Sequence, residues 1–524
     1  MKLTDVLVKC LENEGVEYVF GIVGTETLDL ADSLSRSAKI RYINVRHEQG
    51  AAFMADVYGR LSKKAGVCLS TLGPGAANLV TGIASAKLDH SPLVALIGQA
   101  GVERQHHESH QYVDIVKMLD PATKWSTQIQ DSKTVPTVVR KAFKIAQMEK
   151  PGSVAMVLPE NFTAEQITNT PLPVTPLPEI VPDKEALMTA EELIHTYKKP
   201  FILIGKGVIR QEAVEELQTF INTLQSPAAH SFMAKGVLEK ENPLNFYTFG
   251  FKENDTVLNG INEADLLVVI GFDFVEQLPN SWNKHKLPVL HIDTIPAEVN
   301  EYYPVKWELV GNIKKTLRSL NGAALTRKAW LPSGNLQAKI ELNYRITKQI
   351  DETLTIENVL KLIEMHSSEE TIVISDVGSH KVSIAKTYQP KKPNRLIISN
   401  GLATMGIAIP GSIGAKLACP ANPVICVTGD GGALMNFAEI ETAKRLGLLF
   451  TIIVLDDSML KLEVKQMNKK FGHHYGVTFQ NPDFVELARS FGITGVRPHS
   501  LSELQTILTQ PQTEIVLIDL VTQK

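Results

Sequence analysis

Short apolar runs alternate with stretches of helical periodicity along most of this chain. The clearest example is "VICVTGDGGALMNFAEIETAKRLGLLFTIIVLDDSMLK", residues 424–461. Residues 424–428 are apolar and mostly β-branched, which is typical of a buried strand. Four apolar residues then recur at helical spacing: Phe437, Ile440, Ala443 and Leu446. Gly447 is a suitable helix stop and residues 448–455 are again strand-like, so the pattern predicts a strand–helix–strand unit with parallel strands.

Acidic residues follow both predicted strands. Asp430 follows the first, and Asp456 and Asp457 follow the second. Three glycines surround the first aspartate: Gly429, Gly431 and Gly432. The carboxyl ends of parallel strands share one rim, where ligands of open α/β sheets bind. Carboxylates that converge there repel each other unless a cation such as Mg²⁺ separates them, and a glycine turn before a helix offers N–H groups to phosphates. From this stretch alone, a metal–diphosphate site and a solvated acidic loop beside an ordinary glycine turn both remain open.

The same alternation predicts an α/β protein with three doubly wound parallel-sheet domains. The first domain spans residues 1–165, with strands expected at 18–22, 40–45, 66–70 and 93–97. A proline-rich connector, "NTPLPVTPLPEIVPD", precedes a central domain at 186–321. A weakly patterned second linker, 322 to about 343, leads to the third domain at 345–524. Blocks one and three share a plan, in which the loops after parallel strands are rich in glycine and polar residues.

The central block begins with "PFILIGKGVIR", which raises the question of dinucleotide binding. Gly205 and Gly207 match the first two glycines of the G-x-G-x-x-G fingerprint, but Arg210 stands in place of the third. The pattern therefore favours an ordinary strand–helix turn in a structural domain.

Composition narrows the class of protein. The 524 residues are 44% hydrophobic and 21% charged, which is typical of a globular chain. The net charge of -4 argues against a nucleic-acid or anionic-membrane partner. We expect a cytoplasmic protein, because the N-terminus lacks a signal-peptide core, no apolar run could span a bilayer, and so few cysteines, 4 in 524 residues, fit a reducing compartment. The cysteines also have no metal-ligand spacing.

Three further fragments place polar or glycine residues at strand ends. Glu48 in "RHEQGA" follows a strand at a helix start, where a glutamate commonly serves the helix dipole. Gly73 and Gly75 in "TLGPGAANL" form a turn into a helix. Gly401 and Met405 lie in "NGLATMGIAIPG", where a methionine would by default pack in the core. Each fragment alone has an ordinary structural interpretation.

Together these fragments resemble the thiamin-diphosphate-dependent enzymes of the acetolactate synthase large-subunit family. The similar motifs occur in order over nearly the whole chain: "RHEQGAAFMADVYGR", "TLGPGAANLVTGIASA", "SPLVALIGQ", "DPATKW", "SDVGSH", "NGLATMGIAIPGSIGAKL" and "GDGGALMNFAEIETA". The resemblance implies a pyrimidine-binding domain, a central domain and a diphosphate-binding domain. It also implies an active site between two subunits, hence a homodimer or homotetramer.

The resemblance assigns roles by motif. Glu48 would hold the aminopyrimidine in its imino form, whose nitrogen removes the C2 proton, and Met405 would keep the cofactor bent. Asp430, Asp457 and the carbonyl of Met459 would bind Mg²⁺. The remaining implied cofactor contacts are Gly73, Gly75, Asn78, Gly378, Ser379, His380, Gly401, Gly429, Gly431 and Gly432.

The chain departs from the family pattern around the substrate. Thr25 stands in a loop expected to line the pocket, and Gln466 is nearest to the tryptophan that biosynthetic members use to favour 2-oxobutyrate. Gln111 and Lys124 occupy other substrate-lining positions, and the segment near Gln111 resembles the catabolic form. Where biosynthetic members often have two asparagines this chain has two adjacent aspartates, 456 and 457, which leaves open which of them is the ligand.

The resemblance therefore implies a carboligase that decarboxylates pyruvate and joins it to a second 2-oxo acid, giving 2-acetolactate. The alternatives are another thiamin-diphosphate-dependent decarboxylase or aldehyde carboligase, and a non-catalytic relative. The retained Glu48 argues against a glyoxylate carboligase, which lacks that acid. The expected cofactors are thiamin diphosphate and Mg²⁺. FAD, which biosynthetic members hold in the central domain, is not favoured, and a regulatory subunit is left open.

Overall fold

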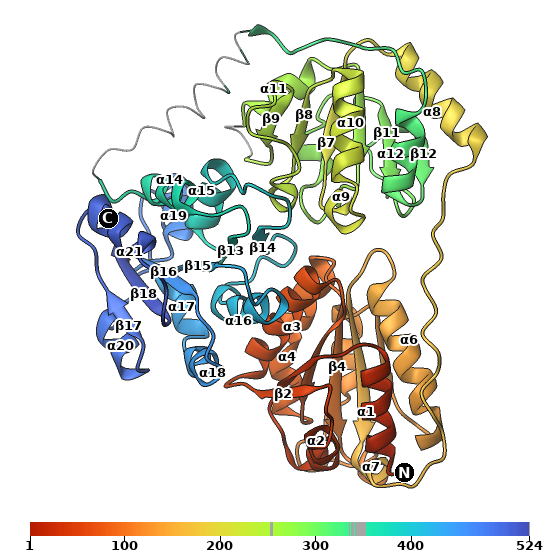
Figure 1. The fold of residues 1–524 in the computed structure, drawn as a ribbon, viewed down its shortest axis with the longest axis vertical. Helices are drawn as coiled ribbons and strands as arrows, with labels where there is room; N and C mark the ends of the chain where they lie inside the picture. The colour runs from red at the N-terminus through yellow and green to blue at the C-terminus, as the bar shows by residue number, and fades with distance from the viewer. Residues whose placement is uncertain (252–254, 335, 337–339, 341–352, 523–524) are drawn as a thin grey trace.

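The computed structural model describes residues 1–524 except 252–254, 335, 337–339, 341–352 and 523–524. In this part of the chain, three six-stranded sheets follow one another, and helices flank each sheet (Figure 1). The strand pairs within each sheet are parallel, so the predicted fold class is confirmed. The predicted start of the third domain, residue 345, and the end of the predicted second linker lie outside the described residues.

The first sheet has the order β2 (Arg41–Asn44), β1 (Tyr18–Gly21), β3 (Gly66–Ser70), β4 (Leu93–Gln99), β6 (Ser153–Pro159) and β5 (Trp125–Gln128). The central sheet has the order β12 (Val305–Val310), β11 (Val289–Asp293), β10 (Leu266–Ile270), β7 (Pro200–Ile204), β8 (Ala228–His230) and β9 (Asn245–Thr248). The third has the order β14 (Leu396–Ile398), β13 (Ile372–Ser375), β15 (Val424–Gly429), β16 (Thr451–Asp456), β18 (Val516–Val521) and β17 (Thr494–Val496). Numbered within their own domains, the outer sheets share the order 2-1-3-4-6-5. The similar plan that the sequence indicated for blocks one and three is thus a shared topology.

Helices cover both faces of each sheet. In the first domain they are α1 (Leu3–Asn13), α2 (Leu28–Ser35), α3 (Glu48–Ser62), α4 (Pro74–Leu88), α5 (Ile115–Leu119), α6 (Val135–Gln147) and α7 (Glu160–Thr163). In the central domain they are α8 (Lys184–Thr196), α9 (Gly207–Arg210), α10 (Val214–Leu224), α11 (Val257–Asn262) and α12 (Ile313–Asn321). In the third domain they are α14 (Ile356–His366), α15 (Ser379–Thr387), α16 (Ala408–Ala418), α17 (Asp430–Met435), α18 (Glu439–Arg445), α19 (Lys461–Phe471), α20 (Phe484–Ser490) and α21 (Leu501–Thr509).

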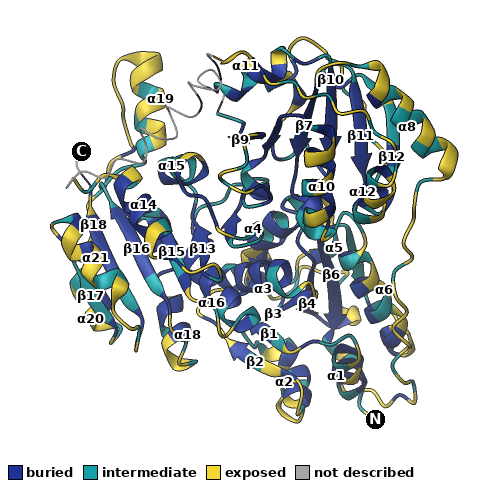
Figure 2. Ribbon diagram, turned by 45° about the horizontal axis from the view of Figure 1, so that its top comes forward, coloured by how far each residue is buried: buried dark blue, intermediate teal, exposed yellow. Residues whose placement is uncertain are grey.

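The first and third domains share one apolar core, which runs through the contact between α3 and α16. At this contact the two helices approach closely, because a Cβ at Gly414 would lie 2.3 Å from the Met54 carbonyl oxygen. The inner strands of all three sheets are largely buried, whereas α19 stands out as an exposed helix (Figure 2). The α3–α16 contact therefore fixes the first domain against the third, while α19 has no buried residue.

The proline-rich connector contains no helix or strand over residues 167–183, and it runs along the first domain up to α8 (Figure 1). None of the helices in the described ranges is long and apolar enough to cross a membrane.

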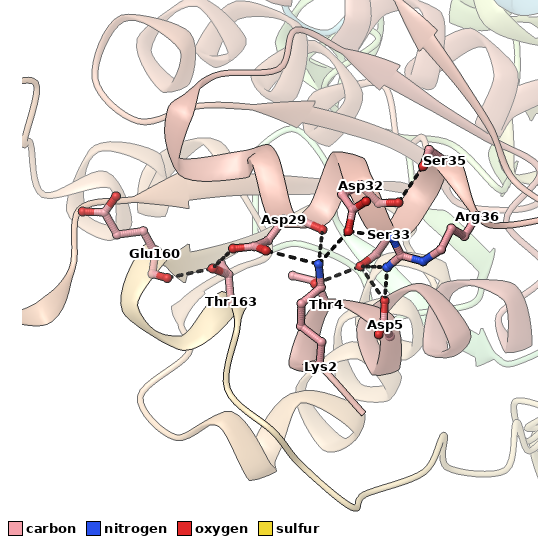
Figure 3. A network of polar contacts seen from close by, with 10 residues as sticks. All are labelled: Lys2, Thr4, Asp5, Asp29, Asp32, Ser33, Ser35, Arg36, Glu160 and Thr163. Carbon is pink, nitrogen blue, oxygen red and sulfur yellow. Dashed lines mark hydrogen bonds and ion pairs between the residues drawn. The ribbon is translucent and has the colours of Figure 1, made fainter.

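A polar network anchors the N-terminus of the chain (Figure 3). Lys2 Nζ donates to Asp29 at 3.1 Å and to Asp32 at 2.8 Å, and Thr163 Oγ1 donates to Asp29 at 2.8 Å. These contacts join Lys2, directly before α1, to α2, and join α2 to the end of α7. They hold α2 in place, and α2 directly follows the 3-10 turn Thr25–Thr27 in the chain.

The predicted unit at residues 424–461 forms with one difference. The helix begins at Asp430, immediately after β15, as α17, whereas the helical spacing in the sequence begins only at Phe437. Asn436 instead separates α17 from α18, with its side chain donating to the Gly406 carbonyl at 2.8 Å. The glycines after Asp430 are thus the first turn of a helix. Their small size is required there, since a Cβ at Gly432 would lie 2.9 Å from Asp376 Oδ1.

Candidate active site

Glu48 lies at the carboxyl edge of the first sheet. It is the first residue of α3 and is only 7% exposed, and its Oε2 accepts a hydrogen bond from Asn78 Nδ2 at 2.9 Å. A Cβ at Gly75 would lie 3.3 Å from Glu48 Oε1. Gly73 has φ +54, and a Cβ there would lie 2.6 Å from the Gln111 carbonyl oxygen. Five sequence-predicted residues therefore gather at one strand-end rim.

Asp430 is the centre of a second polar group, at the carboxyl edge of the third sheet. It is 3% exposed, and its Oδ2 accepts from the N–H groups of Asp457 at 3.1 Å and Ser458 at 2.6 Å. Asn481 Nδ2 donates to the same oxygen at 2.8 Å, and the Gly431 N–H donates to Oδ1 at 2.7 Å. These contacts fix the orientation of the Asp430 carboxylate.

The two adjacent aspartates have different environments. Asp456 Oδ1 accepts from Asn481 Nδ2 at 2.7 Å, whereas Asp457 forms an ion pair with Lys461 at 3.1 Å. Burial and the nearby Asp430 charge raise the pKa of both carboxyls above the ordinary value. A cation between Asp430 and Asp457 would relieve this repulsion.

The donor set suits a hard cation that takes few protein ligands. Among the described residues, no group of three or more His, Cys, Asp or Glu side chains is arranged to hold a metal ion. A cation near Asp430 would therefore depend on two carboxylates, main-chain oxygen and the oxygens of a bound diphosphate. Mg²⁺ is commonly held in this way, so the residues fit it.

The start of α15 offers a place for that diphosphate. His380 is 5% exposed, its Nε2 is buried without a hydrogen-bond partner, and burial lowers its pKa to about 4. The ring is therefore neutral at pH 7. Two glycines pack against this ring. A Cβ at Gly378 would lie 2.8 Å from His380 Cε1, and a Cβ at Gly429 would lie 3.3 Å from it. An unpartnered ring nitrogen, a glycine cradle and the helix N-terminus at Ser379 together fit an anionic group.

Met405 lies beside the Asp430 group, against Gly431. Its Cε would be 3.3 Å from a Cβ at Gly431. Buried Asp376 fixes the residues that follow Met405, because it accepts from the Gly406 N–H at 2.9 Å and the Ala408 N–H at 3.1 Å.

Gly401 packs against the first domain, since a Cβ there would lie 2.7 Å from the backbone of Leu88. In this chain, close packing between domains is what requires glycine at that position.

The two polar groups are separate within one chain. No hydrogen bond or ion pair among the described residues joins the Glu48–Asn78 group to the Asp430–His380 group. Thr25 is exposed at the start of a short 3-10 turn near the first group, and Gln466 lies on exposed α19 near the second. The structure thus divides the predicted substrate residues between two surfaces.

The structure does not bring Lys124 to either group. Lys124 precedes β5, at the amino edge of the sheet, and its Nζ donates to the carbonyls of Met148 and Lys150, both at 2.7 Å. Burial lowers its pKa to about 8. This place follows from the start of β5, which is set by the pairing of β5 with β6.

The central domain has the strand order of dinucleotide-binding folds, 3-2-1-4-5-6 from β9 to β12. However, a Cβ at Gly205 would lie 2.3 Å from the Gly271 carbonyl oxygen, and Gly207 is similarly close. These glycines therefore allow two loops to pack backbone against backbone. Arg210, in place of the third fingerprint glycine, forms an ion pair with buried Asp273 at 2.9 Å.

A cavity of about 680 Å³ adjoins Arg210, between the first domain, the connector and the central domain.

Three residues of this region escaped the sequence interpretation. Asn481 joins Asp430 to Asp456 from a distant loop, with no local signal. Asp89 accepts from the N–H groups of Asn400 and Gly401 at 3.1 and 2.7 Å, and so ties the first domain to the Met405 loop. Glu439 lies within a recognised motif, yet the sequence did not distinguish it from Glu441, two residues further on.

Family models match three segments of the chain. The thiamine pyrophosphate enzyme N-terminal TPP binding domain matches residues 1–118, the central domain matches 187–320, and the C-terminal TPP binding domain matches 376–520.

Several curated proteins are similar over nearly the full chain. The acetolactate synthase of Bacillus subtilis (strain 168) is 32% identical, with 97% of this chain and 90% of the relative covered. The catabolic acetolactate synthase of Raoultella terrigena is 33% identical, with 96% and 91% covered. The acetolactate synthase isozyme 2 large subunit of Escherichia coli (strain K12) is 30% identical, with 93% and 89% covered. This chain belongs to the thiamin-diphosphate-dependent enzymes of the acetolactate synthase large-subunit family.

Proposed function

We propose that this protein is a thiamin-diphosphate- and Mg²⁺-dependent carboligase that decarboxylates pyruvate and joins it to a second 2-oxo acid, giving 2-acetolactate. The observation that carries the proposal is the Asp430 group beside the neutral His380, whose buried Nε2 has no hydrogen-bond partner, at the rim of the third sheet. In a chain of this family, that rim fits a metal-bound diphosphate. The names of the similar acetolactate synthases support the choice of product.

Asp430, Asp457 and the Met459 carbonyl are the proposed metal ligands. Asp457 is preferred over Asp456 because it matches the second metal side chain of the family motif. Both carboxylates have a partner in this chain, Asn481 at 2.7 Å for Asp456 and Lys461 at 3.1 Å for Asp457. His380 and the N–H groups at the start of α15 would bind the diphosphate, with Gly378 and Gly429 leaving space for it.

Glu48 is the proposed catalytic acid. When bound, thiamin diphosphate supplies an electron sink for the pair released as CO₂ leaves. Glu48 would hold the pyrimidine in the tautomer whose nitrogen takes the C2 proton, and Asn78 orients the Glu48 carboxylate. Met405, beside Gly431, would press the bound cofactor into its bent shape.

A second copy of the chain is proposed to complete the site, because Glu48 and Asp430 of one chain do not meet. Large apolar side chains are exposed around α17 and α19: Leu434 38%, Met435 56%, Leu462 37%, Phe471 56% and Tyr475 85%. A homodimer that covers this surface would also exclude water from the reacting carbons. We propose a homodimer or a tetramer built from it.

Small 2-oxo acids are the proposed substrates, and Thr25, Gln111 and Gln466 are proposed to line their pocket. Lys124 is left out, since both of its short contacts are to carbonyls at the far edge of the sheet. FAD is also left out of the proposal, because Gly271 covers the Gly205–Gly207 turn that would have approached a dinucleotide. An absorption spectrum of the purified protein in the visible flavin range tests that choice.

The experiment that tests the proposed function is a product assay. Purified protein is incubated with pyruvate, Mg²⁺ and thiamin diphosphate, and CO₂, acetaldehyde and acetoin are measured before and after acidification. Acetoin that forms only after acidification indicates acetolactate. Acetaldehyde with CO₂ would make the protein a decarboxylase. No turnover, with intact cofactor binding, would make it a non-catalytic relative.

A further inference from the structure

We infer that Glu439 is a positioning residue for Glu48, acting from the third domain on the turn that precedes α3. The inference rests on the proposed function, since it concerns how the proposed catalytic acid is held. It assigns a role to a buried carboxylate that neither the metal site nor the cofactor contacts use.

The contacts of Glu439 cross from one domain to another. Its Oε1 accepts from the N–H groups of Arg46 and His47, both at 3.0 Å, although these residues are 393 and 392 positions away in the chain. Its Oε2 accepts from Thr442 Oγ1 at 2.8 Å within α18. Both oxygens are thus engaged, and the carboxylate is fixed in direction.

The turn held in this way leads directly to Glu48. His47 caps α3 with its side chain, which accepts from the Gln49 N–H at 3.1 Å. Since the N–H groups of Arg46 and His47 point to Glu439, the start of α3 is anchored on the third domain. The orientation of Glu48 toward the pyrimidine therefore depends on α18.

Packing supports the same conclusion. Glu439 is 0% exposed, and a Cβ at Gly50 would lie only 2.5 Å from its Oε1. Glycine at position 50 leaves the space that lets this carboxylate reach the turn. Glu441, on the same helix, instead has a side chain that is 40% exposed and pairs with Arg445 at 2.8 Å. Glu441 also forms an exposed ion pair with the Arg46 side chain at 3.4 Å, and such surface pairs contribute little. It therefore serves as a matched control for a carboxylate charge at the same turn.

A buried hydrogen bond to a charged carboxylate is stronger than a neutral one, and a catalytic group displaced by about 1 Å can lose about 100-fold in rate. Removing Glu439 takes away the acceptor of the Arg46 and His47 N–H groups and frees the turn. The proton chemistry at the pyrimidine should suffer, whereas the metal–diphosphate contacts around Asp430 should not.

The test measures hydrogen–deuterium exchange at C2 of bound thiamin diphosphate by quenched-flow NMR, with no substrate present. The variants are Glu439→Ala, Glu439→Asp, Glu439→Gln and the control Glu441→Ala, all loaded with Mg²⁺ and thiamin diphosphate. Calorimetry gives the cofactor affinity of each variant, and thermal unfolding gives its stability.

We expect Glu439→Ala and Glu439→Asp to slow exchange by about 10- to 100-fold, by analogy with other misplaced catalytic groups. Glu439→Gln should recover most of the rate, since an amide oxygen can still accept both N–H bonds. Cofactor affinity should change less than about threefold in every variant, because Asp430 shares no hydrogen-bond partner with Glu439 and keeps its donors from Asp457, Ser458 and Asn481. Glu441→Ala should match the wild-type protein.

An unchanged exchange rate in Glu439→Asp or Glu439→Ala, with lowered thermal stability alone, would overturn the inference and leave Glu439 a structural residue. If Glu439→Ala does not fold, the Asp and Gln variants decide the matter in the same way. A wild-type protein that exchanges the C2 proton but forms no acetolactate would refute the proposed function and leave this inference standing.

Discussion

Replacing Asn481 with alanine tests whether the loop after α19 controls metal binding. Its Nδ2 donates to Asp430 at 2.8 Å and to Asp456 at 2.7 Å, so one amide holds two carboxylates. The substitution removes both bonds. Asp430 keeps its N–H donors from Asp457 and Ser458, and should remain near its place but be less firmly oriented.

The size of the effect follows from these contacts. Hydrogen bonds to charged groups are worth about 1.5–3 kcal/mol each, and loss of a residue that orients a metal ligand typically weakens metal binding by about 10- to 100-fold. We expect Asn481→Ala to weaken Mg²⁺ binding by that factor. Asn481 stabilises the two carboxylates in the Mg²⁺-free protein as well as in the Mg²⁺-bound protein, so part of the loss cancels. We therefore expect an effect near the lower end of that range, about 10-fold.

The assay is a calorimetric titration of Mg²⁺ into protein with excess thiamin diphosphate. Asn283→Ala is the matched control, because Asn283 is also a buried amide and bonds to the backbone of Leu287 and Tyr302 in the central domain. It should lower the melting temperature and leave Mg²⁺ affinity unchanged. If Asn481→Ala behaves like Asn283→Ala, the reasoning that ties Asn481 to the metal is refuted.

Three further predictions concern the proposed chemistry. Glu48→Gln should keep the fold and reduce turnover by about two to four decades, as expected for lost acid–base assistance; a near wild-type rate in a steady-state assay would remove Glu48 from its role. Asp430→Ala should abolish Mg²⁺-dependent binding of thiamin diphosphate, Asp457→Ala should do nearly as much, and Asp456→Ala much less. Calorimetry that finds Asp456→Ala more damaging than Asp457→Ala would shift the ligand assignment by one residue. With equal pyruvate and 2-oxobutyrate, the enzyme should show little preference for 2-oxobutyrate, because Gln466 offers no large apolar contact and one methylene is worth about 1–3 kcal/mol. A ratio of acetohydroxybutyrate to acetolactate far above about ten would mean that another residue supplies that contact.

Local sequence determined where the strands end and which residues follow them. The β-branched runs and glycine turns placed Glu48 after β2, Gly73 after β3 and Asp430 after β15, as the structure has them. These features depend on backbone preferences and side-chain alternation over a few residues, which a single sequence contains. The family resemblance then suggested the roles that we propose, since it too rests on short motifs at strand ends.

Tertiary packing decided the contacts between distant segments. Asn481 reaches Asp430 across 51 positions, Asp89 reaches Gly401 across 312, and Glu439 reaches Arg46 across 393. No periodicity records such pairs, because they arise when α3 packs on α16 and the domains take up their places. The position of Lys124 at the far edge has the same origin, since β5 is the edge strand and its pairing with β6 fixes where it starts. Local sequence therefore indicated which chemical groups to expect, and packing determined which of them are held together within one chain and which lie apart in it.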